Sequence, residues 1–373
     1  MRILYIAPGN NPHTWKWVGW FGRRYPGEVA LLPYQDPVPN GILQNIEIIT
    51  PHIPPYKIAS ITLPQKSRVR RIVKDYAPDL LHALWGYGSG NYAAWTGFHP
   101  FLLSPWGSEI TIFPYREGVK GKIQRELVIG ALKSADAITA TSEFLRDAII
   151  ELAPDIKQPV LFPYGVDTSI FDPEKIGEPL RFESEEHIQV GGEIFTVGFF
   201  KSLVKTYGPD ILLRAIAISR REIPGLRCVM AGEGEMRSRL EQMARELEIS
   251  DCVIFPGLIP HIDMPRALAG VDIVAMPSRY ETFGVTALEA SAMRKPVILT
   301  SKWGMVEVAR DGETGFYIEP EGSESLAKYI VKLAQNRKLR DEMGKAGRDF
   351  VRSKFEFNEI MERADEFCQA LIK

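Results

Sequence analysis

The sequence predicts an α/β protein built from two doubly wound parallel sheets, and three observations lead to this class. A chain of 373 residues is too long for one ordinary hydrophobic core. Short apolar runs alternate with helical patterns in both halves, as parallel α/β folds require. The stretch 167–192 is rich in proline, glycine and charge and lacks a clear period, so we place the domain linker there.

The first half of the chain contains seven apolar runs with the length of strands. The run after Met1-Arg2 is too short for a signal peptide and is interpreted as the first strand. The expected strands are 3–7, 28–32, 47–49, 80–84, 101–104, 137–140 and 160–162. The expected helices are 67–76, 120–133 and 143–152.

The second half repeats this alternation. We expect strands at 195–199, 227–231, 253–255, 273–276, 296–299 and 316–318, with helices between them. The expected helices include 210–222, 236–247 and 283–294. In the second of these, Met236, Leu240, Met243 and Leu247 share one face. The predicted domains are therefore 1–170 and 171–355.

Composition narrows the class of protein. The net charge is −2, with 45% apolar and 25% charged residues, which is typical of a soluble globular protein and gives no sign of a nucleic-acid partner. Cys228, Cys252 and Cys368 are scattered without the spacing of metal ligands, so we interpret them as buried thiols of a reducing compartment. We expect a cytoplasmic protein, since no run is long enough to span a bilayer.

Residues 276–320 contain the most informative motif. Glu281 and Glu289 lie eight positions apart, and we expect the first on a loop and the second in the second turn of a helix. Helix-terminal amides at Gly284 and Val285 suit a diphosphate, while the carboxylates suit sugar and ribose hydroxyls. The glycine lets a ligand approach the backbone closely. The alternative is an exposed glutamate followed by a glutamate that the helix dipole favours.

The motif reads Pro-Ser-x-x-Glu-x-Phe-Gly-x-x-x-Leu-Glu-Ala-x-Ala-x-x-x-Pro-Val, and it resembles the signature of the retaining glycosyltransferases of family 4. Segments 301–307 and 311–316 resemble those that follow it in that family. The resemblance implies the GT-B fold, in which two Rossmann-like domains face a central cleft. It also implies that the C-terminal helix 356–373 packs back onto the first domain.

The same resemblance implies an activity. A sugar would move with retention from a UDP- or GDP-sugar to a hydroxyl of a glycan, a lipid-linked molecule or a small molecule. The family needs neither a metal ion nor a cofactor. In keeping with this, the sequence contains no Asp-x-Asp motif.

Donor-site residues are implied in turn. Segment 197–210 resembles a family variant with Lys-Ser-Leu followed by Lys-x-Tyr-Gly, which makes Lys201 and Lys205 the cations that stabilise the departing diphosphate. Glu281 completes the implied catalytic group. The implied donor contacts are Gly232, Gly234, Gly257, Leu258, Phe283, Gly284, Val285 and Glu289. The alternatives are solvated lysines and, for the glycine turn at 232–234, ordinary helix capping.

An acceptor site is expected in the first domain, which holds six of the seven tryptophans. Several of them flank strand ends, and aromatic faces suit the C–H faces of sugars. The candidate contacts are Asn11, His13, Trp15, His82, Trp106 and Glu109. For any single tryptophan or histidine, core packing is the alternative. Many relatives have a histidine near position 106, where this chain has a tryptophan, so no catalytic histidine is carried over.

The basic segment 66–74 is a candidate for peripheral contact with the inner face of a membrane, as in some family members. Its alternative is a solvated helix face.

Two other functions stay open. One is a nucleotide-sugar-binding protein of the same fold without transfer activity. The other, an NAD-dependent oxidoreductase, depends only on Gly86-Tyr87-Gly88-Ser89-Gly90, which lacks the spacing of the dinucleotide fingerprint.

Overall fold

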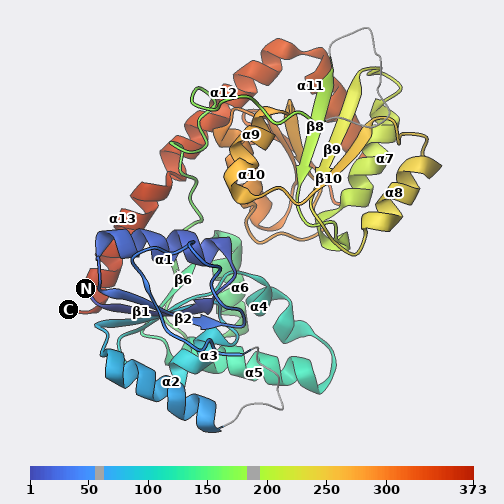
Figure 1. Cartoon of the computed structure of the whole chain (residues 1–373). Helices are drawn as coiled ribbons and strands as arrows, with labels where there is room; N and C mark the ends of the chain where they lie inside the picture. Colours follow the sequence, from blue (N-terminus) through green and yellow to red (C-terminus); the bar gives the residue numbers. More distant parts are fainter. Residues whose placement is uncertain (55–62, 183–193) are drawn as a thin grey trace. The chain divides into compact units, whose positions relative to one another are not determined.

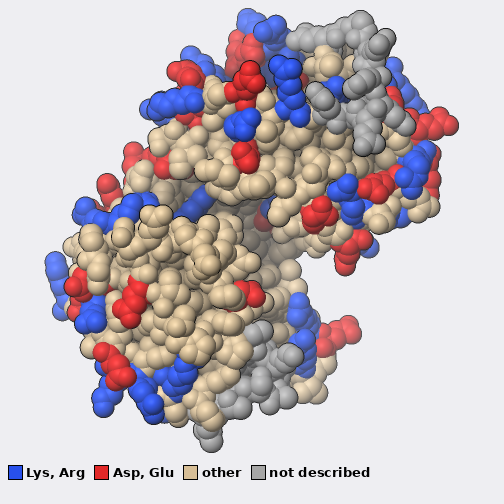
Figure 2. All heavy atoms as spheres, viewed as in Figure 1, with Lys and Arg blue, Asp and Glu red and all other residues tan. Residues whose placement is uncertain are grey.

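The computed structural model of the chain describes residues 1–54, 63–182 and 194–373 (Figure 1). The chain divides into unit 1, Met1–Pro163 with Glu359–Lys373, and unit 2, Tyr164–Asn358. The sequence placed these divisions after residues 170 and 355, and Gly191-Gly192 of the expected linker lie outside the described residues. On the face shown in Figure 2, acidic and basic side chains are interspersed over both units.

Unit 1 is built on a seven-stranded sheet in which every pair of neighbours is parallel, in the order β3-β2-β1-β4-β5-β6-β7. Every residue of β2, β4, β5 and β6 is buried, as expected for a parallel sheet covered on both faces. The strands are β1 (Ile3–Pro8), β2 (Val29–Tyr34), β3 (Glu47–Ile48), β4 (Leu80–Leu84), β5 (Phe101–Ser104), β6 (Ala137–Ala140) and β7 (Val160–Leu161).

Helices cover both faces of this sheet. One core contains residues of α2 (Leu63–Tyr76), α3 (Ser89–Ala94), α5 (Gly118–Ser134) and α6 (Glu143–Leu152). On the opposite side, α1 (Pro12–Arg24) packs against α13 (Phe357–Leu371), and Trp17 contacts the cluster of Phe162, Ile360 and Ala364. The short α4 (Ser108–Thr111) and the 3₁₀ turn η2 (Phe113–Tyr115) follow β5.

Unit 2 has a six-stranded parallel sheet in the order β10-β9-β8-β11-β12-β13. The order reverses direction next to β8, which is the position where doubly wound sheets bind ligands at their carboxyl edge. The strands are β8 (Phe195–Phe200), β9 (Leu226–Ala231), β10 (Val253–Gly257), β11 (Ile273–Met276), β12 (Val297–Thr300) and β13 (Gly315–Ile318).

Two hydrophobic cores lie on the two faces of this second sheet, and Figure 1 shows the helices that cover each face. One is formed with α7 (Pro209–Ser219), α8 (Arg237–Glu246) and α11 (Ser323–Gln335). The other is formed with α9 (Met264–Ala269), α10 (Val285–Ala292) and α12 (Arg337–Lys354). Phe199 belongs to the first core and Phe200 to the second, which shows the alternation of side chains along β8.

The three cysteines are free thiols and are buried. Cys228 and Cys252 lie in the core beside α7 and α8, and Cys368 lies on α13. Burial raises the pKa of Cys252 to about 11 and that of Cys368 to about 12. All three thiols are therefore protonated and unreactive near neutral pH.

The helix α1 is the main element that the sequence analysis missed, since no helix was expected between the strands 3–7 and 28–32. Asn11 is the N-cap of α1, and its side chain accepts a hydrogen bond from the His13 amide at 2.8 Å. Pro12 occupies the first helical position. An asparagine followed by proline is a recognised helix start, and this signal was available in the sequence.

Candidate functional site

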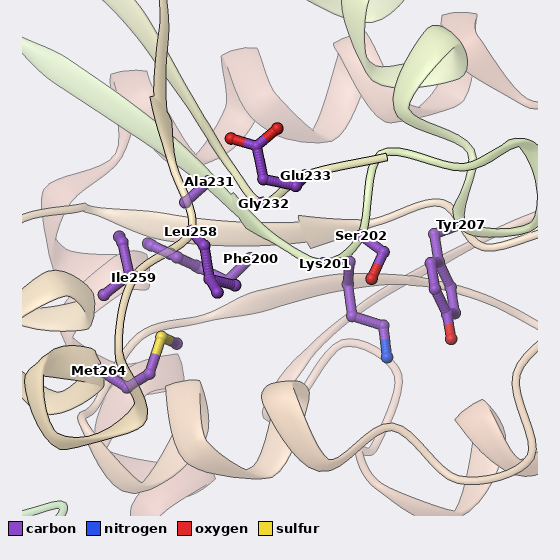
Figure 3. Close-up of a pocket in the computed structure, with 10 residues that line it drawn as sticks. All are labelled: Phe200, Lys201, Ser202, Tyr207, Ala231, Gly232, Glu233, Leu258, Ile259 and Met264. Carbon is purple, nitrogen blue, oxygen red and sulfur yellow. The ribbon is translucent and has the colours of Figure 1, made fainter. Parts of the chain in front are cut away.

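A cavity of about 370 Å³ opens at the carboxyl edge of the unit 2 sheet. It is lined by residues that follow β8, β9 and β10. Figure 3 shows that its apolar side chains gather at one end and that Lys201, Ser202 and Tyr207 lie at the other. The lining residues are Phe200, Lys201, Ser202, Tyr207, Ala231, Gly232, Glu233, Leu258, Ile259 and Met264. Such a cavity suits a ligand with an apolar part and an anionic part.

Lys201, at the polar end of this cavity, forms an ion pair with Glu281. The Lys201 Nζ lies 2.5 Å from Glu281 Oε2, and the two side chains are 16% and 12% exposed. The same ammonium lies 4.4 Å from the centroid of the Tyr207 ring. The structure thus brings together one predicted cation and one predicted carboxylate from loops 80 positions apart in the chain (281 − 201).

The charge of Lys201 is maintained by its neighbours. Burial alone would lower its pKa, but the Glu281 carboxylate, with Tyr207 and Glu289, raises the pKa above its ordinary value. Lys201 is therefore a fixed positive charge near neutral pH. A fixed, partly desolvated cation is what a developing phosphate charge requires.

The start of α10 lies beside this cation. The Thr286 hydroxyl, in the first turn of α10, donates to the Phe200 carbonyl at 3.5 Å, and Phe200 directly precedes Lys201. Gly284 is the N-cap, with a φ of 107° that favours glycine, and in the described chain no side chain caps this end. Val285 is the first helical residue, so its amide belongs to the open end of the helix.

Phe283 is placed differently from the prediction. Its side chain is buried in the core, with its ring centroid 5.9 Å from those of Tyr164 and Phe355. It anchors the loop before α10 and does not present its ring to the cavity. The pattern identified the position, but only its backbone is available to a ligand.

Glu289 pairs with a histidine that the sequence analysis did not select. The Glu289 side chain is 6% exposed, and its Oε1 lies 3.1 Å from Nε2 of His261, in the 3₁₀ turn η4 (His261–Asp263). The His261 ring packs edge-on against Phe171. Its only sequence signal was its place shortly after the implied donor contacts Gly257 and Leu258, and a single histidine there is too common to be informative.

The predicted glycines bring backbone segments close together. A Cβ on Gly232 would lie 2.1 Å from the Lys201 carbonyl oxygen, and one on Gly234 would lie 2.4 Å from the Leu203 carbonyl oxygen. The Gly232 amide donates to the Gly257 carbonyl at 2.9 Å. Leu258 is 76% exposed and lines the cavity. These glycines pack the strand ends tightly, and Gly232 also reaches the cavity wall.

Lys205 begins the 3₁₀ turn η3 (Lys205–Tyr207) and is exposed. Its carbonyl accepts from Arg279 Nη1 at 2.9 Å. It is not among the residues that line the cavity, whereas Lys201 is. A role for Lys205 in stabilising a diphosphate therefore stays a prediction.

In unit 1, the rings of His13, Trp85 and Trp106 form a row. His13 and Trp106 are among the candidate acceptor contacts. The ring centroids of His13 and Trp106 lie 5.9 Å apart, and those of Trp85 and Trp106 are also 5.9 Å apart. These residues follow β1, β4 and β5, so they share the carboxyl edge of the sheet. All three are half-buried.

Glu109 holds the loops beneath this row. Its carboxylate accepts from the amides of Gly86, Trp106 and Gly107 at 3.1, 2.6 and 3.0 Å. Burial raises the pKa of Glu109, and these donors oppose the shift. The side chain is fully buried, so it orders the loops and does not contact an acceptor directly.

The structure also corrects the interpretation of His82. It is fully buried in β4, where Nε2 lies 2.8 Å from the Ser104 Oγ and the ring packs against Tyr5 and Trp17. Burial lowers its pKa to about 3, so the imidazole is neutral. Trp15 and Asn11 also make internal contacts, since Trp15 Nε1 donates to the Gly9 carbonyl at 2.8 Å and Asn11 caps α1.

The basic segment 66–74 lies in α2, and several of its side chains contact unit 1. Val69 and Val73 are buried in the core. The Lys66 ammonium lies 4.0 Å above the Trp95 ring, and Arg70 donates to the Trp95 carbonyl. These contacts favour the alternative of a helix packed on its own domain, and a membrane contact through this segment stays a prediction.

Among the described residues, none of the helices combines the length and apolar character needed to cross a bilayer. Within the same residues, no three histidine, cysteine or acidic side chains gather as a metal site would need.

Side chains of unit 1 occupy the space beside the glycine-rich loop at 86–90. A Cβ on Gly88 would lie 2.3 Å from the Tyr34 ring, and the Gly86 amide binds Glu109. The loop is therefore tightly packed against unit 1.

Comparison with known families gives two matches. Residues 182–350 match the model described as glycosyl transferases group 1, and residues 2–142 match the model described as glycosyl transferase 4-like. The first match covers most of unit 2, including the cavity, and the second covers most of unit 1.

Curated relatives match part of this chain, with about a quarter of the aligned residues identical. A GDP-mannose-dependent α-(1-6)-phosphatidylinositol monomannoside mannosyltransferase of Mycobacterium tuberculosis is 28% identical over 241 residues, which is 63% of this chain and 62% of the relative. The mannosylfructose-phosphate synthase of Agrobacterium fabrum is 26% identical over 65% of this chain and 54% of its own length. The chain thus spans about three fifths of the first relative and about half of the second.

Solved structures share the fold. The HepE protein of Anabaena, in a crystal structure with UDP and glucose, superposes with a TM-score of 0.80 and 19% identity, and all of both chains are covered.

Proposed function

Since the chain belongs to the family 4 glycosyltransferases and has their GT-B fold, we propose that it transfers a sugar from a nucleoside diphosphate sugar to a hydroxyl group. One observation supports this most directly. Lys201 lines the cavity beside the open start of α10, and its ammonium pairs with Glu281. A cation and helix amides suit a diphosphate, and a neighbouring carboxylate suits sugar hydroxyls.

The donor would lie along the length of this cavity. Phe200, Leu258, Ile259 and Met264 would receive the base, and Lys201 would receive the diphosphate. Glu289 would accept hydrogen bonds from the ribose hydroxyls, and Glu281 from the donor sugar. The cation would thus bind the anionic diphosphate, and the carboxylates would accept hydrogen bonds from hydroxyls.

The proposed reaction proceeds with retention and needs no protein nucleophile. The bond between the anomeric carbon and the diphosphate oxygen breaks, and the acceptor oxygen bonds to the same face of the sugar. The acceptor proton passes to the departing phosphate oxygen. Lys201, with Lys205 as a second cation, would stabilise the charge that develops on the diphosphate.

The acceptor would contact unit 1 at the row formed by His13, Trp85 and Trp106. Half-buried rings can stack on a sugar while their polar atoms bind its hydroxyls. The mannosyltransferase and the HepE structure are named for different nucleotides, GDP and UDP, so the donor is proposed only as a nucleoside diphosphate sugar.

Thermal-shift screening against UDP-, GDP- and ADP-sugars tests the donor site. A ligand that binds the native state raises the melting temperature, by an amount that grows with its concentration above Kd. We expect one nucleotide to stand out, and we expect Glu289→Gln to reduce its effect. If no nucleotide shifts the melting temperature, the proposal is wrong.

Incubation with a radiolabelled form of the selected donor tests catalysis. Release of the sugar to water or to an added acceptor supports a transferase. Tight binding without any release would instead identify a nucleotide-sugar-binding protein that does not catalyse transfer.

A further inference from the structure

Arg279 ties together the two loops that carry the proposed catalytic residues. It lies two positions before Glu281, in the loop between β11 and α10. Its amide donates to the Thr206 carbonyl at 2.8 Å, and its Nη1 donates to the Lys205 carbonyl at 2.9 Å. Both acceptors belong to η3, so main chain and side chain hold the same turn.

Each N–H group of the Arg279 guanidinium donates a hydrogen bond. Nη1 and Nη2 donate to the two carboxylate oxygens of Asp210 at 2.7 and 2.9 Å. Nη2 also donates to Glu321 Oε2 at 2.7 Å, and Nε donates to Glu321 Oε1. With the Lys205 carbonyl, these five acceptors match the five N–H groups of an arginine.

Burial and charge make this contact strong. The side chains of Arg279 and Asp210 are 20% and 12% exposed. The hydrogen bonds that Arg279 donates to Asp210 raise the pKa of Arg279. Burial alone would raise the pKa of Asp210, but Arg279 lowers it below its ordinary value. Paired, bidentate and partly desolvated contacts are the most specific in geometry.

The turn that Arg279 holds reaches both lysines. Lys205 is its first residue, and the ring of Tyr207, its last, lies against the Lys201 ammonium. We propose that Arg279 is a positioning residue that fixes this turn against the Glu281 loop. It would hold the cations where the donor diphosphate binds, without touching the donor itself. This inference rests on the proposed function.

Arg214 provides a matched control within the same network. Its Nη2 lies 3.0 Å from Asp210 Oδ2, on the carboxylate that also accepts from Arg279, and Arg214 itself lies on α7, outside η3 and the Glu281 loop. Removing Arg214 perturbs the same carboxylate and leaves the two loops tied. If replacing Arg279 weakens ligand binding and replacing Arg214 does not, the loss therefore arises from the broken contacts between the two loops.

The test compares a diphosphate with its nucleoside by calorimetry. Wild-type protein is first titrated with UDP, GDP and ADP, and the tightest ligand is carried forward with its nucleoside. Since lysine cannot reproduce the arginine fork, we expect Arg279→Lys to weaken diphosphate binding about tenfold and nucleoside binding less than about threefold. We expect Arg214→Ala to change neither.

Each other outcome has a distinct meaning. If wild-type protein binds none of the three nucleotides, the proposed function itself fails. If it binds one and Arg279→Lys binds that diphosphate equally well, the positioning role is wrong. Equal weakening of diphosphate and nucleoside, with a lowered melting temperature, would show a purely structural role and also overturn the inference. Arg279→Lys is the deciding variant because Arg279→Ala leaves Asp210 without its main partner and can unfold the domain.

Discussion

The contact between Lys201 and Glu281 is an ion pair between two largely buried side chains. Each group lowers the cost of burying the other, since an unpaired charge in such a position is expensive. In the proposed reaction, an incoming diphosphate would compete with Glu281 for the ammonium. The carboxylate would then be free to accept hydrogen bonds from the donor sugar, which would link donor binding to activation of the site.

We predict that Glu281→Gln separates these two effects. Without the competing carboxylate, the Lys201 ammonium should bind a nucleoside diphosphate as tightly as in wild-type protein or several-fold more tightly. Transfer should fall by about a hundredfold, as when a group that acts in the transition state is removed. Calorimetry with the diphosphate and steady-state kinetics with the sugar donor measure the two quantities. A large loss of diphosphate affinity would show that Glu281 does not compete for Lys201.

The lowered pKa of His82 predicts how the free energy of unfolding depends on pH. Its pKa is lowered from 6.5 to about 3 by burial, so the unfolded chain takes up a proton below pH 6.5 that the native chain does not. The contribution of the neutral His82 to the free energy of unfolding is therefore fully present above that pH and is lost as the pH falls toward 3. Between pH 7 and 4 the loss from this group is about 3 kcal/mol.

The variant His82→Gln checks this, because it keeps a polar group near Ser104 but does not titrate. We expect its unfolding free energy in urea to fall less between pH 7 and 4 than that of wild-type protein. An identical fall in both proteins would mean that other groups cause the acid sensitivity.

At the level of residues, the sequence pattern predicted which positions belong to the site better than it predicted where their side chains point. Glu281 and Glu289 are where the motif placed them because the motif describes a loop and a helix, which are local structures. Phe283, His82 and Glu109 turn inward because tertiary packing decides burial, and one sequence does not show that. His261 and Arg279 were missed because their partners are distant in the chain.

Among the elements, α10 depends on an unusual N-cap. Gly284 has a φ of 107°, and a Cβ there would lie 2.9 Å from Met305 Sδ. The backbone conformation that opens the first helical amides is thus one that other residues adopt only under strain.

We predict that Gly284→Ala destabilises unit 2 by about 2 kcal/mol and also weakens diphosphate binding, since the helix start must shift. The matched control is Gly312→Ala, with a φ of 72° and no atom within 4 Å of the added Cβ. This control should cost about 1 kcal/mol and leave binding unchanged. Urea unfolding and calorimetry measure both. Equal effects of the two variants on binding would argue against a site at α10.

The cap of α1 gives a second prediction at this scale. Asn11→Ala should destabilise the protein by about 1 kcal/mol, whereas Asn11→Ser should not, because serine also accepts a hydrogen bond at an N-cap. Urea unfolding measures both variants. If Asn11 also contacted the acceptor, Asn11→Ser would lower activity at unchanged stability, and the cap would not be its whole role.

Elements were predictable where the chain is strongly periodic or apolar. Strands β4, β5, β6 and β11 and helix α6 have the bounds expected from sequence. The helix α1 was missed because its cap signal is only two residues long and, of its buried residues, only Val18 and Phe21 are large and apolar. Short elements such as η3 and η4 have no period to detect and are shaped by neighbours such as Arg279.

At the scale of the whole molecule, unit 1 depends on the end of the chain. Asp365 on α13 accepts from the Tyr25 hydroxyl at 2.5 Å and pairs with Arg24, while Ile360 and Ala364 pack against Phe162. Residues nearly the full length of the chain apart thus complete one core.

We predict that deleting residues 359–373 destabilises unit 1 and causes aggregation, because Trp17 and Phe162 would be exposed to water. Deleting only Ile372 and Lys373, which follow the helix, is the control and should have little effect. Thermal unfolding and light scattering compare the two. A truncated chain that stays monomeric with an unchanged melting temperature would contradict the packing described above.

The architecture as a whole followed from the alternation of strands and helices, and the resemblance in 276–320 supplied the family. Strand order could not be read from the residues alone, because it depends on which edges pair after the chain folds.

The buried, protonated thiols of Cys228, Cys252 and Cys368 have a practical consequence. Maleimide dyes should leave them untouched, so cysteines introduced at two exposed sites can carry a fluorophore pair without removing any native residue. Energy transfer between one dye in each unit would then report, molecule by molecule, how nucleotide alters the separation of the two halves.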